Sequence, residues 1–175
     1  MTQTILVIGV GNRDRGDDGA GLEVARRLCA RRPWGAVVRE SPGEIVGLLE
    51  AWRGYRRVVL IDAASSQAGR PGRVHRFEAH RSPLPALTLS TSGHSLGVAE
   101  ALEMARALGC LPESVIVYAI EGETFSLGAP LSTPVRQAVR RVERRVLREI
   151  GEVSVTVWPQ VLKETCRTRN IHVLE

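Results

Sequence analysis

Short apolar runs alternate along the chain with segments whose apolar residues recur every three or four positions. Continuous apolar runs are typical of strands covered on both faces, and the wider spacing is typical of amphipathic helices. Strands are predicted at residues 4–9, 37–39, 57–61, 73–78 and 114–120. Helices are predicted at residues 19–30, 43–52, 95–108 and from Pro134 to residue 150. This alternation predicts an α/β fold, a three-layer α/β/α sandwich with a mostly parallel five-stranded sheet.

The domain organisation follows from length and pattern. A chain of 175 residues favours one domain, and no internal repeat or linker divides it. We expect a single α/β domain over residues 1–150 and a carboxy-terminal extension of unassigned role over residues 151–175. Within that extension, residues 153–158 are rich in β-branched side chains and predict one more strand.

Charge and hydropathy exclude several classes of function. The net charge is +5, but much of the excess lies on one helix whose arginines alternate with apolar positions. Aromatic residues that would stack on bases are missing from it, so a solvated helix face is favoured over a polyanion or partner contact, and no nucleic-acid partner is expected. No apolar run is long enough to span a bilayer. The first ten residues read as a buried strand and not as a signal peptide, which predicts a cytoplasmic protein.

The three cysteines, Cys29, Cys110 and Cys166, are far apart and form no Cys-x-x-Cys pair. A zinc ribbon or a redox motif is therefore unsupported. We expect two buried thiols and one in the tail.

Candidate chemistry gathers where the predicted strands end. Asp17 and Asp18 follow the first strand and its turn, Asp62 is the residue directly after the third strand, and His94 opens a helix after a long loop. Ligands of open α/β sheets bind at the carboxyl ends of the strands, so these side chains are expected at one edge. One of the two adjacent acids would suffice to cap the following helix; we assign the cap to Asp17. Asp18, Asp62 and His94 then predict a divalent-cation site with oxygen and nitrogen ligands.

The turn Gly9-Val10-Gly11-Asn12 invites a dinucleotide-binding interpretation. That fingerprint requires a third glycine where this chain has Asp14, and the acidic loop would repel a pyrophosphate. A non-enzymatic nucleotide-binding module stays as an alternative, as does a stand-alone hydrolase that holds its own zinc through Asp18, Asp62 and His94. No nucleophile elbow or HExxH helix is present.

Several of these segments resemble, in order, the motifs of the hydrogenase maturation proteases. They are Ile5 to Gly21, Ile61 to Ala63, Ser92 to Leu102, and Tyr118 to Gly128 followed by Leu131 to Pro134. The resemblance covers roughly residues 4–150 and implies a hydrogenase maturation protease-like fold of the phosphorylase/hydrolase-like type. It also implies an endopeptidase that removes a carboxy-terminal peptide from the nickel-loaded precursor of a nickel–iron hydrogenase large subunit.

By position, the resemblance implies that Asp18, Asp62 and His94 are the metal-binding and catalytic residues. The nickel would be supplied by the precursor, no organic cofactor is implied, and a monomer is expected. Relatives often carry Asp-Gly-Gly-Thr after the second strand, whereas this chain has Glu40-Ser41-Pro42-Gly43. Glu40 is the candidate for the missing aspartate and for a catalytic role, with Glu44 or no residue as the alternatives.

Overall fold

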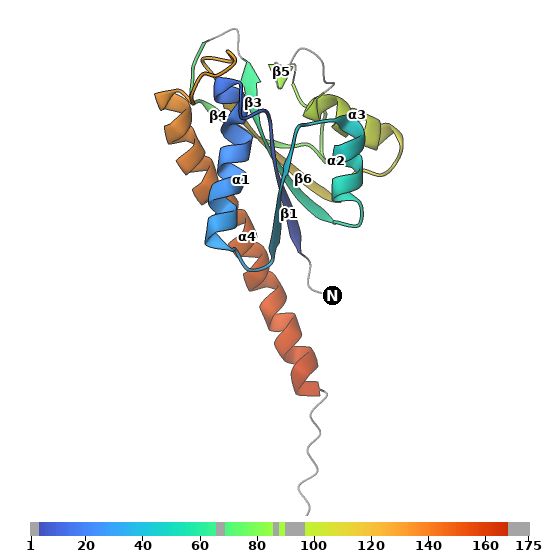
Figure 1. Ribbon diagram of the computed structural model, residues 1–175. Coiled ribbons are helices and arrows are strands. Elements are labelled where there is room, and N and C mark those ends of the chain that lie inside the picture. The colour runs from blue at the N-terminus through green and yellow to red at the C-terminus, as the bar shows by residue number, and fades with distance from the viewer. Residues whose placement is uncertain (1–3, 66–68, 86–87, 90–96, 168–175) are drawn as a thin grey trace, which may run out of the picture.

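A twisted sheet with helices on both faces forms the protein (Figure 1). The computed structural model describes residues 4–65, 69–85, 88–89 and 97–167, with the backbone alone at 88–89 and 152–167. The main path of the sheet has the order β2-β1-β3-β6-β4, and a short β5 pairs with β3. The strands are β1 (Ile5–Val10), β2 (Ala36–Ser41), β3 (Arg57–Ser65), β4 (Val74–Glu78), β5 (Thr88–Leu89) and β6 (Ser114–Glu121).

The parallel core of the sheet consists of β2, β1, β3 and β6. The predicted five strands are confirmed, and β4 supplies the exception to the parallel arrangement because it runs antiparallel to β6 at the edge of the sheet. Every residue of β1 is buried, which explains its unbroken apolar run. The only addition in the described residues is β5, a two-residue strand in a segment predicted to be a loop.

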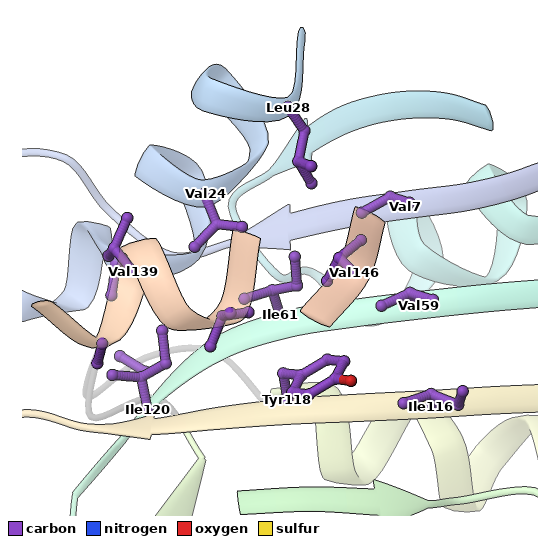
Figure 2. Packing of buried hydrophobic residues seen from close by; sticks show 14 of the residues in the cluster. Val7, Val24, Leu28, Val59, Ile61, Ile116, Tyr118, Ile120, Val139 and Val146 are labelled. Carbon is purple, nitrogen blue, oxygen red and sulfur yellow. The ribbon is translucent and has the colours of Figure 1, made fainter. Parts of the chain in front are cut away.

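Two apolar layers cover the sheet. On one face lie α1 (Ala20–Arg31) and α4 (Thr133–Arg167), whose apolar stripes pack on alternate residues of β1, β3 and β6. Figure 2 shows this layer, in which side chains of α1 and α4 lie over those of the sheet: Val24, Leu28, Val139 and Val146 over Val7, Ile61 and Ile120. On the other face lie α2 (Ile45–Trp52) and α3 (Val98–Ala107). The predicted three-layer sandwich is therefore confirmed.

The long helix α4 corrects one prediction. Residues 153–158 are helical and do not form a strand, because α4 continues without a break to Arg167 (Figure 1). Their β-branched side chains were the signal for a strand, but Val146, Ile150, Val153 and Val157 repeat at intervals of four, three and four, which extends the apolar stripe of the helix. No helix in the described part of the chain is both long and apolar enough to cross a membrane.

The prediction of two buried thiols is wrong for Cys29 and Cys110. Cys29 and Cys110 are both exposed rather than buried. Cys29 lies near the end of α1 on its outer side, and Cys110 follows α3 in the turn that leads to β6. Neither position points into one of the two apolar layers. The side chain of Cys166 lies outside the described residues.

Candidate functional site

The carboxyl end of β1 lies beside Asp62 of β3 at one edge of the sheet, and β3 continues three residues further, to Ser65. The two strands are parallel, with Gly9 of β1 opposite Ile61 of β3, so Asp62 lies level with the residues that leave β1. A loop from Gly11 to Arg15 and a 3-10 helix, η1 (Gly16–Gly19), connect β1 to α1. Asp18 is in η1, next to β3, and its charge acts directly on Asp62.

Two glycines allow η1 and α1 to approach the strands this closely. A Cβ atom on Gly21 would lie 2.2 Å from the carbonyl oxygen of Ile61 and 2.3 Å from that of Val10. A Cβ atom on Gly11 would lie 1.8 Å from the carbonyl oxygen of Asp18, and its φ of +139° is one that other residues rarely adopt. The glycines of the first motif therefore serve close backbone packing that holds Asp18 beside Asp62.

Asp62 is completely buried at this edge. Its Oδ1 atom accepts a hydrogen bond of 2.8 Å from the backbone N–H of Ala63, whereas Oδ2 has no hydrogen-bond partner. Burial raises the pKa of Asp62 to about 8; the Ala63 N–H opposes this shift and the charge of Asp18 adds to it. A carboxyl group in this state binds a proton near neutral pH unless a cation replaces the proton.

Asp18 is 1% exposed, and neither of its carboxylate oxygens has a hydrogen-bond partner of good geometry. Burial raises its pKa, and this effect outweighs the opposing effects of the Arg15 charge and the backbone N–H of Asn12. The edge therefore contains three buried carboxylate oxygens without partners, two from Asp18 and one from Asp62. Buried carboxylates without hydrogen bonds are costly, and binding a cation removes that cost.

Asp17 has a different role from the helix cap that its position predicted. Helix α1 begins after Gly19 and has no side-chain cap. The Asp17 carboxylate instead accepts hydrogen bonds from three backbone N–H groups of the segment between β6 and α4: those of Glu123 (2.8 Å), Thr124 (3.1 Å) and Ser132 (2.6 Å). The prediction failed because these donors come from a segment more than 100 positions away in the sequence. Asp17 thus fastens that segment to the edge.

Glu40 lies near the end of β2, opposite Gly9 of β1, and so belongs to the same edge of the sheet. Its carboxylate is half-exposed and forms an ion pair of 2.5 Å with the guanidinium group of Arg13. The structure therefore brings Asp18 and Asp62 together and places Glu40 nearby, already paired. His94 lies outside the described residues. Among the residues that are described, no group of three His, Cys, Asp or Glu side chains is arranged to hold a metal ion.

A second buried acid at this edge was not predicted. Glu121, at the end of β6, is 2% exposed, and its carboxylate lies 2.6 Å from Nε2 of His75 on β4. The His75 ring stacks on Phe77, with a centroid distance of 5.9 Å. Glu121 is the last residue of β6, and in the sequence it directly follows a predicted buried strand, as Asp62 does, so the same signal was present. The antiparallel pairing of β4 with β6 brings its partner His75 to it.

The fold and this edge define an α/β/α sandwich protein with a buried pair of acids, Asp62 on the central strand β3 and Asp18 in η1 beside it. The family model described as hydrogenase maturation protease matches residues 41–149, more than half of the chain. The protein belongs to the hydrogenase maturation protease family and is a peptidase of that class. The match includes Asp62 and begins after Asp18.

This chain aligns with nearly the whole length of several solved structures of similar fold. The hydrogenase maturation protease HybD from Thermococcus kodakarensis is 24% identical, over 84% of this chain and 99% of that one, with a TM-score of 0.66. HybD from E. coli is 22% identical, over 85% and 93%, with a TM-score of 0.66. A hydrogenase 2 maturation peptidase from Thaumarchaeota archaeon SCGC_AB-539-E09 is 25% identical, over 85% and 98%, with a TM-score of 0.58. No curated protein matches the sequence.

Proposed function

We propose that this peptidase removes the carboxy-terminal peptide from the nickel-loaded precursor of a nickel–iron hydrogenase large subunit. The observation that carries the proposal is the set of three buried carboxylate oxygens without partners, on Asp18 and Asp62. Oxygen ligands and an imidazole suit a divalent cation, and His94 would supply the imidazole. The family of the chain supports a role in hydrogenase maturation.

In this proposal the nickel belongs to the substrate. Free protein holds Asp62 largely protonated at neutral pH, because its pKa is about 8. A substrate cation that binds between Asp18 and Asp62 displaces that proton and becomes the charge partner of the two carboxylates. A precursor without nickel offers no such partner, so it binds in no fixed position and is spared. The bound cation can polarise a carbonyl group or lower the pKa of water at the scissile bond.

Cleavage assays with two forms of one precursor test the proposal. Purified protein is incubated with nickel-loaded and with nickel-free precursor, and the released peptide is measured by mass spectrometry. We expect cleavage of the loaded form alone. Equal cleavage of both forms would refute recognition through nickel. One tight zinc ion per chain in protein prepared without chelators would favour the stand-alone zinc hydrolase instead.

Single substitutions test the residues. Asp62→Asn and His94→Ala are expected to abolish processing while circular dichroism shows an intact fold. The matched control is Asp14→Asn, which removes an exposed acid from the loop that leads to η1. We expect this control to process precursor at the normal rate. Normal processing by Asp62→Asn would remove the buried acids from the mechanism. A Glu40→Gln variant with normal turnover would show that Glu40 has no catalytic role.

A further inference from the structure

A small cavity lies at the edge of the sheet formed by β4, opposite the edge formed by β2. It lies between β4 and helix α4. It has a volume of about 320 Å³ and is lined by Arg76 of β4, Tyr118 of β6, and Arg145, Arg148 and Glu149 of α4. We call this region the β4–α4 seam. Both β4 and α4 pack against β6. The seam faces α4, whereas Asp62 faces the α2–α3 layer with its neighbours Leu60 and Ala64.

The charges of the seam do not cancel. Glu149 accepts hydrogen bonds of 2.9 Å from Nε of Arg76 and 2.9 Å from the hydroxyl group of Tyr118. Arg76 also pairs with Glu78 at 3.1 Å, so its charge is compensated. Arg145 and Arg148 have no ion pair or hydrogen bond to any described residue, although both line the cavity. Within the described part of the chain, the seam therefore presents two guanidinium groups that form no ion pair.

The neighbouring backbone of β4 is open for pairing. The carbonyl of Arg73 and the N–H of Ala79 bond to β6, at 2.9 Å each. Because alternate residues of an antiparallel strand direct their N–H and C=O groups to opposite sides, those of Val74 and Arg76 point outward. No described residue hydrogen-bonds to these outward groups. Edge strands of this kind accept an added strand unless something covers or blunts them.

We propose that the β4–α4 seam binds an extended acidic segment of a protein substrate, which adds to β4 as an outer strand. Alternate side chains of that segment lie on the α4 side of the sheet, beside Arg76, where carboxylates at every second position meet Arg145 and Arg148. A nucleic acid fits the same charges less well. The outward N–H and C=O groups complement a peptide backbone, and the one aromatic residue in the cavity, Tyr118, is buried and cannot stack on a base.

The inference rests on the proposed function only in taking the segment to be part of the hydrogenase precursor. The direct test uses the full chain and a fluorescein-labelled twelve-residue peptide of alternating glutamate and threonine, with binding followed by fluorescence anisotropy at low salt. We expect saturable binding that weakens about tenfold in the double variant Arg145→Glu/Arg148→Glu, since two attractive contacts become repulsive. The double variant Arg140→Glu/Arg144→Glu makes the same charge change on the outer face of α4 and is expected to bind normally.

Three further comparisons separate strand addition from general attraction. A peptide of the same composition in two blocks, six glutamates then six threonines, is expected to bind more weakly because only alternation places the acids on one side. Val74→Pro removes an outward N–H at the first residue of β4, where proline is tolerated, and is expected to weaken binding several-fold. Equal binding of the block peptide, an equal loss in the outer-face control, tighter binding of an oligonucleotide or no binding at all would each overturn the proposal.

The precursor itself separates this inference from the proposed function. With nickel-loaded precursor, Arg145→Glu/Arg148→Glu is expected to raise KM about tenfold with kcat unchanged, because the seam lies away from Asp62. Asp62→Asn is expected to lose turnover and keep peptide binding. If no precursor is cleaved while the alternating peptide still binds the seam, the proposed function fails and the seam stands. If cleavage occurs with an unchanged KM in the seam variant, the seam fails alone.

Discussion

Asp62 makes the stability of the protein depend on pH in a direction opposite to that of most carboxylates. Its pKa is raised from 3.8 to about 8 by burial, and the charge of Asp18 adds to the shift. Each pKa unit corresponds to about 1.4 kcal/mol. Between pH 5 and pH 9 the folded protein retains a proton that the unfolded chain has released, so the free energy of unfolding falls by about 4 kcal/mol as pH rises through this range.

The sign follows from proton counting. A group whose pKa is higher in the folded state stabilises the fold below its unfolded pKa, and this contribution is lost as pH rises through the folded value. Asp62→Asn removes the titration and keeps an acceptor at Oδ1 for the Ala63 N–H. Its new amide N–H₂ group replaces Oδ2, which has no hydrogen-bond partner. We therefore expect the variant to gain about 4 kcal/mol relative to the unaltered protein between pH 5 and pH 9.

Urea unfolding at five pH values, followed by circular dichroism in metal-free buffer, measures this difference. Asp14→Asn serves as the control, since its side chain is exposed and its curve is expected to run parallel to that of the unaltered protein. The decisive quantity is the difference between variant and unaltered protein at each pH, because other groups titrate equally in both. Parallel curves for Asp62→Asn across the whole range would refute a buried, high-pKa carboxyl in β3.

Three further predictions concern the parts that hold this edge. Asp17→Asn is expected to lower the free energy of unfolding by about 2–4 kcal/mol, because it loses three charge-assisted hydrogen bonds; an unchanged urea midpoint would contradict this. Gly21→Ala is expected to lower both stability and activity, since its Cβ would meet backbone oxygens at 2.2–2.3 Å. Gly47→Ala, in the open interior of α2, is expected to stabilise the fold by about 1 kcal/mol. Thermal unfolding and cleavage assays of both variants test the contrast. Glu143 is a nearly buried acid that pairs with two arginines of α1, and these arginines keep its pKa low despite its burial. Glu143→Gln is therefore expected to weaken the attachment of α1 to α4 by about 1–3 kcal/mol, seen as a lower urea midpoint at pH 7 and a smaller difference at pH 4. An equal difference at both pH values would contradict this.

Apolar patterning predicted most of the fold because it reports directly which faces are buried. The unbroken apolar run of β1 and the apolar stripe of α1 left little choice of element type. At residues 153–158 the predicted strand is wrong, because α4 continues through this segment and its helical spacing of apolar residues continues from Val146. Local propensity is a weak guide where a neighbouring helix supplies a stripe to extend.

For the site, position at the end of a predicted strand was a sufficient signal for Asp62, although β3 in fact continues to Ser65, and nearness to the end of β1 was sufficient for Asp18. What the sequence could not provide were contacts between distant segments. The three donors to Asp17 come from the segment after β6, and the pairing of Glu121 with His75 depends on β4 running antiparallel to β6. Nothing in a local pattern distinguishes a carboxylate with such partners from one without.

The contrast between Asp17 and Asp18 gives the physical reason to place function at this edge. The two are adjacent and equally buried, so the cost of removing each carboxylate from water is similar. For Asp17 the fold repays that cost with three backbone N–H donors, whereas for Asp18 it provides none of good geometry, and the charge of Arg15 offsets only part of the cost. Each unsatisfied buried group costs roughly 1–3 kcal/mol, which is a substantial share of a domain's stability. The fold therefore satisfies all hydrogen bonds of one buried acid and leaves the carboxylate of its neighbour without a partner. An external partner of positive charge would remove the remaining cost, and a cation carried by the substrate has that charge.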